Sequence, residues 1–180
     1  MHTSHVVRQA TRMLALLTAL CGCAGTKGSV TPLHVVSDDN RLQTFRNLEL
    51  RETADAGVTI SPADLDRIRD LIIARIHQEA PGRFAAINSA SDAPSTLRAT
   101  LRFTQYDAGD AAARLMLAGL GSIQIKATLQ MTDAANDALL REYEITKTFA
   151  WGGIYGASTT IQDVEEGFAD AVVAALVTED

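Results

Sequence analysis

Cysteine is nearly absent from this chain of 180 residues, and its two cysteines, Cys21 and Cys23, lie one residue apart near the start. At that spacing they cannot form an ordinary structural disulfide, and no later cysteine could pair with either. Thiolate ligation of zinc or of an iron–sulfur cluster has no support in the folded part. We therefore expect no disulfide framework, no metal site and no cofactor.

Positive charge is also scarce. The chain has 16 Lys and Arg residues against 22 Asp and Glu, a net charge of −6. Arg8 and Arg12 fall in a segment that we expect to be removed, which would leave −8 on the mature chain. Binding to nucleic acid requires a basic surface. We therefore exclude nucleic acid as a partner.

No apolar run is long enough to cross a membrane, because the run from Met13 to Leu20 is far shorter than the roughly 20 residues required. It follows a polar and positively charged segment, 1–12, which is the layout of a secretory signal peptide. At its end, Leu20-Cys21-Gly22-Cys23 has a large aliphatic residue three positions before a cysteine and a glycine just before it. This sequence resembles the lipobox of bacterial lipoproteins.

The lipobox resemblance implies that residues 1–22 are a signal peptide and that Cys23 becomes the acylated first residue. Acyl chains contribute about 0.8 kcal/mol per buried methylene, so three chains would hold the protein on a membrane. Ala24 rather than Asp follows, which favours an outer-membrane location with the domain facing the periplasm. Two alternatives stay open: a secreted protein cleaved near Ala24, and Cys21 as a less good acyl acceptor. We expect a flexible tether over 23–40 and one domain over 41–180, because 24–34 is small and polar with a proline.

Alternating apolar and polar residues predict the sheet. From Ile123 to Thr132 every odd position is apolar and every even one polar, which is the period of a half-buried strand. The same pattern occurs from Leu97 to Thr104 and from Tyr143 to Phe149, so these segments predict an antiparallel meander. Lys147 would point inward under strict alternation, and we expect a β-bulge near it. Shorter strands are expected over 45–50 and 83–87.

Two segments have the spacing of amphipathic helices. Ser61-Pro62-Ala63-Asp64 offers an N-cap, a proline at the first helical position and an acid at N3, and an apolar stripe continues to just before Pro81. A second stripe begins at Ile161, with acidic residues in its first turns. The predicted fold is α/β (α+β): a two-layer sandwich in the order β-α-β-β-β-β-α. Its sheet is mainly antiparallel, with four to five strands, and both helices cover one face.

A glycine-containing signature lies between the first two strands of the meander. Tyr106-Asp107-Ala108-Gly109-Asp110, Arg114 and Gly119-Leu120-Gly121, followed by an alternating strand that ends at Asp133, resemble the bacterial lipoprotein family called domain-of-unknown-function family 4410. The chain departs from that family where Ala135-Asn136-Asp137 replaces a glycine and where Ser122 or Ile123 replaces a third one. The resemblance implies an outer-membrane-tethered periplasmic domain without an established activity.

Three groups of residues are candidate sites. Gly152, Gly153 and Gly156 precede a helix and could hold an anion, although a tight turn explains them better. Asp107, Asp110 and Arg114 could form an acid–base or cation site, or a capped loop with an internal salt bridge. Met116, Leu117 and Leu120 form either a partner patch or a cover over the core.

The sequence favours a non-catalytic function. The function we expect is a membrane-anchored periplasmic lipoprotein that acts as a protein–protein interaction or envelope-assembly module. Its partners would be the membrane, through Cys23, and envelope proteins or further copies of itself. The alternative is a binding module for a small anionic or envelope ligand at the turn 152–156. An enzyme that uses the Asp107 region is the least favoured class, because no nucleophile motif such as Gly-x-Ser-x-Gly occurs.

Overall fold

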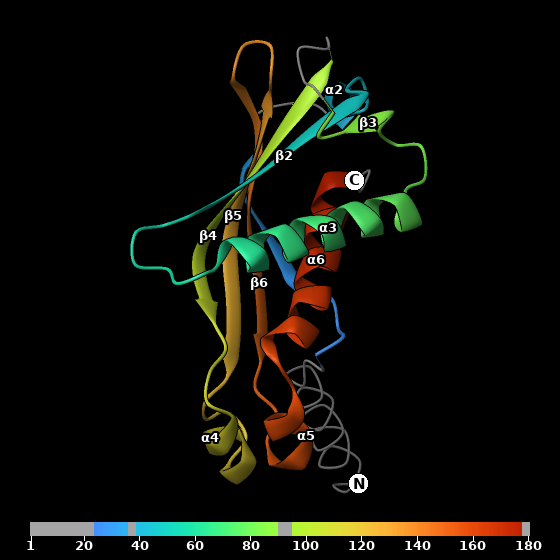
Figure 1. The fold of residues 1–180 in the computed structure, drawn as a ribbon. Coiled ribbons are helices and arrows are strands. Elements are labelled where there is room, and N and C mark those ends of the chain that lie inside the picture. Colours follow the sequence, from blue (N-terminus) through green and yellow to red (C-terminus); the bar gives the residue numbers. More distant parts are fainter. Residues whose placement is uncertain (1–23, 36–38, 90–94, 178–180) are drawn as a thin grey trace, which may run out of the picture.

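The computed structural model describes residues 24–35, 39–89 and 95–177 (Figure 1). The leader 1–22 and Cys23 lie outside the described residues. The strands are β1 (Ser29–Val35), β2 (Asn47–Ala54), β3 (Ala86–Ile87), β4 (Thr96–Asp107), β5 (Ile123–Asp133) and β6 (Ala138–Phe149). The helices are α2 (Asp39–Leu42), α3 (Pro62–Glu79), α4 (Ala111–Met116), α5 (Gly153–Ser158) and α6 (Ile161–Val177).

The fold is of the mixed α+β class, with a six-stranded sheet in the order β1-β6-β5-β4-β2-β3. The predicted meander is confirmed as β4, β5 and β6, which pair antiparallel. The predicted strand number and element order are wrong in detail, because β1 and the short helices α2, α4 and α5 are additional. β2 and β3 also run parallel to the strands they pair with. The parallel pairing follows from the connection through α3, which carries the chain across the sheet before β4 begins.

Both long helices cover the same face of the sheet (Figure 1). Phe168 of α6 packs on Phe103 of β4, with ring centroids 5.7 Å apart. On α3, Arg69 reaches Glu52, which points to the same face of β2 as the buried Leu48 and Leu50. α3 and α6 also pack on each other. One continuous core therefore lies between the sheet and the two helices.

The predicted start of α3 is confirmed. The Ser61 hydroxyl accepts a hydrogen bond from the Asp64 amide at 3.1 Å, and the Asp64 carboxylate accepts one from the Ser61 amide at 3.3 Å. This reciprocal capping box satisfies two amides that the helix itself cannot pair. The Ser61 hydroxyl also donates to the carboxylate and, with Arg67, lowers the pKa of Asp64.

The opposite face of the sheet carries polar side chains, as the alternation predicted. Arg98 of β4 pairs with Glu49 of β2 at 2.8 Å, and Gln130 of β5 donates to Glu142 of β6 at 2.7 Å. Burial opposes ionisation of Glu49, but hydrogen bonds from Arg98 and Arg51 outweigh it and lower the pKa of Glu49. These pairs lie across neighbouring strands, the arrangement in which opposite charges stabilise a sheet.

The predicted tether is wrong for Ser29–Val35, which forms edge strand β1 and pairs antiparallel with β6. Val30 packs partly against the core opposite Ile145. A proline is compatible with this position, because an edge strand does not need every amide for pairing. The small polar residues before β1 obscured a segment that has enough β-branched residues to form a strand.

Residues 24–28 also lie against the domain. Ala24 is buried, and the Gly28 amide donates to the Gly167 carbonyl of α6 at 2.7 Å. Lys147 points inward, as strict alternation requires, and its Nζ donates to the carbonyl and hydroxyl oxygens of Thr26. The predicted bulge near Lys147 is wrong, because the register shifts of β6 and its neighbours lie elsewhere. The buried ammonium has polar partners instead, which buried charges require.

We predict that Gly167→Ala destabilises the domain by about 1 to 3 kcal/mol, because a Cβ there would lie 2.1 Å from the Thr26 carbonyl oxygen. Without that clash, alanine in a helix would add stability of about 1 kcal/mol. Urea unfolding measures the difference. Gly25→Ala is the control, since its Cβ would meet nothing within 4 Å. Equal or greater stability of Gly167→Ala would show that residues 24–28 are not seated on α6.

Candidate functional site

The sequence signature and the glycine-rich turn meet at one end of the sheet. We call residues 107–122 and 150–160 the tip. It contains α4 and α5, which pack against each other beyond the ends of β4, β5 and β6 (Figure 1). Two of the three candidate groups lie entirely in the first part of the tip and the third in the second part. The fold therefore brings together all three groups that the sequence singled out.

Arg114 is the centre of the tip. It is 2% exposed, and its guanidinium donates to backbone carbonyls on both parts of the tip. Nε reaches Gly156 at 2.7 Å, and Nη2 reaches Thr159 at 3.1 Å. Nη1 reaches Ala108 at 3.1 Å and Gly121 at 2.6 Å. A planar fork of five donors suits this task, because the acceptors lie in different directions.

Asp107 and Asp110 are loop and helix caps in the structure. The Asp107 carboxylate accepts from the Gly109 amide at 2.8 Å, and that of Asp110 accepts from the amides of Ala112 and Ala113 at 2.8 and 3.1 Å. This agrees with the predicted capped loop. The predicted internal salt bridge is wrong, because the Arg114 guanidinium binds carbonyl groups.

Two glycines of the signature face each other with positive φ. Gly109 has φ +62° and Gly121 φ +62°. A Cβ on Gly109 would lie 2.2 Å from the Gly121 carbonyl oxygen, and one on Gly121 2.3 Å from that of Asp110. Glycine is therefore required twice, by conformation and by the close approach of two backbones.

The glycine-rich turn is the start of α5, and Gly152 is its N-cap residue. A Cβ on Gly152 would lie 2.6 Å from the Ala118 amide nitrogen, and one on Gly156 2.2 Å from the Trp151 carbonyl oxygen. Gly153 has φ +72°. Gly152 allows the close packing of α5 on the α4 loop, Gly156 a close approach within its own turn, and Gly153 the positive φ. All three roles agree with the turn interpretation.

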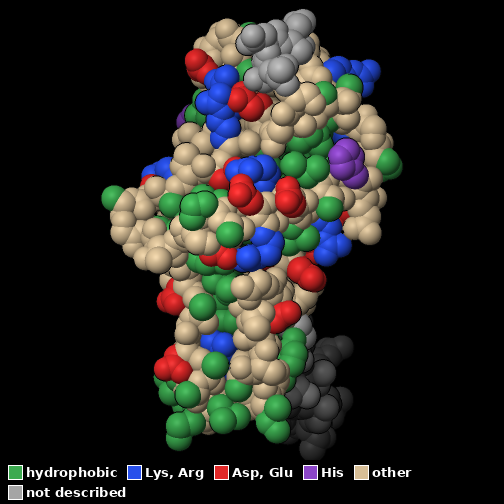
Figure 2. All heavy atoms as spheres, in the orientation of Figure 1, with side chains coloured by type: hydrophobic (Ala, Val, Ile, Leu, Met, Phe, Trp, Pro, Cys, Tyr) green, Lys and Arg blue, Asp and Glu red, His purple; other side chains and the backbone are tan. Residues whose placement is uncertain are grey.

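The apolar candidates do not fold back over the core. Met116 is 86% exposed, Leu117 61% and Leu120 52%. Of the two alternatives for these residues, the surface patch is the one that fits the structure. More apolar side chains of the tip are exposed beside them, and Figure 2 shows hydrophobic side chains gathered at this end of the molecule.

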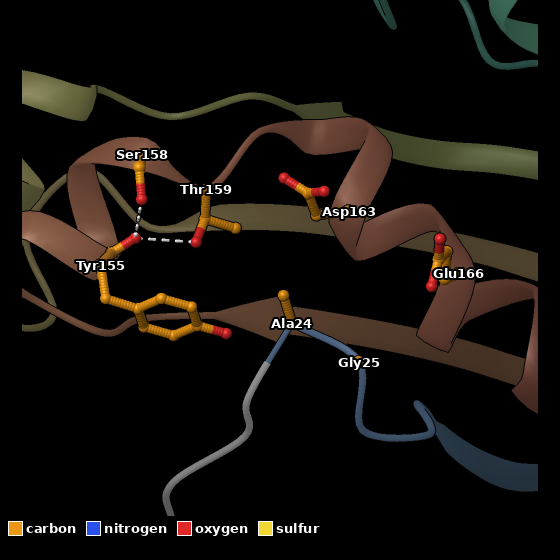
Figure 3. Close-up of a pocket in the computed structure, with 7 residues that line it drawn as sticks. All are labelled: Ala24, Gly25, Tyr155, Ser158, Thr159, Asp163 and Glu166. Atoms are coloured by element: carbon orange, nitrogen blue, oxygen red, sulfur yellow. Dashed lines mark hydrogen bonds between the residues drawn. The ribbon is translucent and has the colours of Figure 1, made fainter.

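An open pocket of about 270 Å³ lies between α5, the start of α6 and the first described residues. Its lining contains the side chains of Tyr155, Asp163 and Glu166, with Ala24 and Gly25 opposite (Figure 3). Asp163 is also the cap of α6, since its carboxylate accepts from the Thr160 amide at 2.8 Å. Two carboxylates in the lining make this pocket unfavourable for an anion.

Sequence reasoning missed a buried polar cluster between α3, α6 and β4. Glu165 is 1% exposed and accepts two parallel hydrogen bonds from Arg67, each 2.8 Å long. The Tyr106 hydroxyl donates to the same carboxylate at 2.6 Å. The hydrogen bond to Glu165 raises the pKa of Arg67, although burial opposes it. Glu165 looked like an ordinary acid of the first helical turns, so only the packing of three elements reveals its role.

A β-bulge places Tyr106 in this cluster. The register of β4 on β5 shifts between Phe103 and Gln105, and Tyr106 then pairs with the inward-facing Ile125. Without the shift, alternation would leave Tyr106 on the polar face. Burial, followed by the hydrogen bond to Glu165, raises the pKa of the Tyr106 phenol. The cluster joins two helices to the sheet, and both oxygens of the Glu165 carboxylate accept hydrogen bonds.

Within the described ranges, no cluster of three or more His, Cys, Asp or Glu residues could hold a metal ion. Across those same ranges, no helix combines the length and apolar character that crossing a membrane requires.

We predict that Arg114→Lys destabilises the protein by about 2 to 4 kcal/mol. A lysine keeps the charge but cannot reach carbonyls on both parts of the tip, so buried acceptors lose their donors. Chemical denaturation measures this, with Arg102→Lys as the control. Arg102 lies on the polar face and pairs with Asp55 at 2.8 Å while half exposed, so its replacement should change stability by less than about 1 kcal/mol. Similar values for both variants would contradict the role of Arg114.

We predict a weaker alkaline loss of stability in Tyr106→Phe than in the unchanged protein. The folded state holds the phenol proton more tightly than the unfolded chain, in which tyrosine titrates near 10. Stability from this group is therefore complete below about pH 10 and falls as the pH rises further. Melting temperatures between pH 8 and roughly pH 11 test it. Tyr155→Phe, half exposed on the tip, is the control, and parallel curves for the unchanged protein and Tyr106→Phe would contradict the prediction.

Comparison with known proteins finds several solved structures that are similar to this chain. PelC from Paraburkholderia phytofirmans, described as a dodecamer, matches with a TM-score of 0.55 and 12% identity, over 84% of this chain and 99% of that one. A single-residue variant of it, also a dodecamer, matches with a TM-score of 0.54 and 12% identity over 83% and 96%. A protein from Xanthomonas campestris matches with a TM-score of 0.49 and 13% identity over 81% and 93%. At 12% identity the likeness to PelC concerns the fold alone.

Among curated proteins, none matches this sequence. The model of a protein family described as "Domain of unknown function (DUF4410)" matches residues 29–153. The match begins at the first residue of β1 and contains the whole first part of the tip. The prediction from the Gly109–Gly121 signature is thus confirmed, and the chain belongs to the DUF4410 family.

Proposed function

We propose that the protein is a non-catalytic lipoprotein of the bacterial envelope, which presents its domain for contacts with other protein subunits. In this proposal Cys23 carries the acyl chains, the anchor lies in the outer membrane and the domain faces the periplasm. The lipobox at residues 20–23 supports the anchor. The carboxylates that chemistry would need, on Asp107, Asp110 and Glu165, are engaged in capping and in the buried cluster. That engagement supports a non-catalytic role.

The observation that carries the proposal is the exposed edge of the sheet at β1. Leu33 and Val35 are 52% and 57% exposed there, and β1 pairs only with β6 in the described sheet. An edge strand with exposed apolar side chains is a ready surface for another chain. PelC, which has the same overall fold, is described as a dodecamer. These facts together support assembly with further subunits, copies of this chain included.

Side-chain contacts are the mode of assembly that β1 favours. Pro32 lacks an amide hydrogen, and the register on β6 shifts between Pro32 and His34. Both features restrict the addition of a long partner strand. Neither feature prevents the exposed side chains of Leu33 and Val35 from packing against a partner. The anion-binding alternative at 152–156 gains no such support, because the neighbouring pocket carries Asp163 and Glu166.

We predict that a photo-reactive amino acid at Val35 forms protein adducts in intact cells, and that Leu33→Glu reduces the adduct yield at least several-fold. A charge there must be desolvated when a partner covers the strand. The same amino acid at Thr104, exposed on the polar face, is the control for non-specific capture. Mass spectrometry of the adducts distinguishes a second copy from a different protein. No adduct at Val35 beyond the Thr104 background would refute the proposed interface.

A further inference from the structure

Exposed apolar side chains concentrate at the tip. Nine large hydrophobic side chains are exposed in the described residues, and seven of them belong to the tip. Scattered single hydrophobic residues are normal on a protein surface, whereas a gathered set marks a contact with another apolar phase. The seven residues are Leu115, Met116, Leu117, Leu120, Trp151, Ile154 and Tyr155.

Charged residues are few in the tip, and its two carboxylates, Asp107 and Asp110, lie between the end of β4 and the start of α4. No Asp, Glu, Lys or Arg occurs from Thr148 to Gln162, and between Ala111 and Ile125 the only one is Arg114. Arg114 is 2% exposed and donates to four backbone carbonyls, so it presents no charge at the surface. Elsewhere Figure 2 shows charged side chains spread over the visible face. The part of the tip formed by residues 111–122 and 150–160 exposes no charged side chain, and with a tryptophan and a tyrosine it has the composition of a membrane–water boundary.

The start of the described chain lies beside this surface. Ala24 and Tyr155 line the same pocket, and Ala24 is 6% exposed (Figure 3). A peptide link places the Cα of Cys23 about 3.8 Å from that of Ala24. No free tether separates Cys23 from the domain, because residues 24–28 are bound to α6 and β6. Acyl chains on Cys23 would therefore enter a bilayer next to α5.

We propose that the tip is a second membrane contact, in which the α4 and α5 side chains enter the interface of the phospholipid bilayer that holds Cys23. Its occupant is the headgroup–acyl boundary of neutral phospholipids, since the tip has no exposed basic residue to recognise anionic headgroups. In this orientation the tip faces the bilayer, and the sheet edge β1 faces along the membrane plane. The part of this inference that concerns Cys23 rests on the proposed function; the apolar tip does not.

The single tryptophan of the chain, Trp151, lies in the tip and serves as the reporter. The full chain, purified from a bacterial membrane, is reconstituted into phosphatidylcholine vesicles whose acyl chains carry bromine near the headgroup or near the methyl end. We expect the emission of Trp151 to shift to the blue and to be quenched by bromine, more strongly at the headgroup end. We also expect protection from aqueous acrylamide.

A variant that introduces negative charge tests whether the apolar surface causes the membrane contact. Met116 and Ile154 are 86% and 84% exposed, so the pair Met116→Glu and Ile154→Glu removes no core packing. We expect quenching by bromine to fall several-fold and acrylamide access to rise, with an unchanged melting temperature. The pair Leu33→Glu and Val35→Glu adds the same charges outside the tip and should leave quenching unchanged.

The mass of the N-terminal peptide reports acylation of Cys23 separately. An acylated protein with unquenched Trp151 overturns the tip proposal and leaves the anchor standing. Quenched Trp151 without acyl mass supports the tip and refutes the anchor, and absence of both refutes both. Protection from acrylamide without bromine quenching shows that a protein covers the tip, which also overturns the proposal.

Discussion

A charged side chain on the buried face of the sheet fixes the position of the first described residues, 24–28. Lys147 extends from β6 under α6, where an ammonium group needs acceptors, and Thr26 supplies a carbonyl and a hydroxyl oxygen. Gly167 leaves the space in which residues 24–28 can approach α6. Because Thr26 is three residues from Cys23, satisfying one lysine also fixes the start of the domain beside the tip. If Cys23 carries the proposed anchor, the distance between the lipid and the domain follows from the core.

Two buried charged side chains, Arg114 and Glu165, hold separate parts of the fold together. Arg114 binds carbonyls of both parts of the tip, and Glu165 joins α3, α6 and β4. A buried guanidinium or carboxylate is stable only when its hydrogen-bonding capacity is used, and in both cases several partners use it. Arg114 therefore holds together the tip, on which the proposed membrane contact depends, and Glu165 holds both long helices on the sheet.

The tip and the β1 edge are suited to different binding partners. The tip exposes seven large apolar side chains, has no exposed basic residue and is adjacent to the position of the proposed anchor. In contrast, β1 has two exposed apolar residues on a sheet whose open face carries paired charges. A bilayer accepts the first without specificity, and a protein partner is suited to the second. An orientation with the tip at the membrane would turn β1 toward neighbouring subunits, which makes the membrane contact and the proposed assembly compatible.

Alternation and capping in the sequence were sufficient for β4, β5, β6 and both long helices, because period and caps are local properties. The sequence also revealed the signature, through its resemblance to a known family, and the apolar loop, through its composition. Alternation and capping could not reveal that β1 completes the sheet, since an edge strand with few buried side chains has a weak pattern. The inward turn of Tyr106 after a bulge, the partners of Lys147 and the meeting of α4 with α5 depend on contacts between distant residues, such as Arg114 with Thr159. Only the tertiary structure decides these, because register and long-range hydrogen bonds are set by packing between elements.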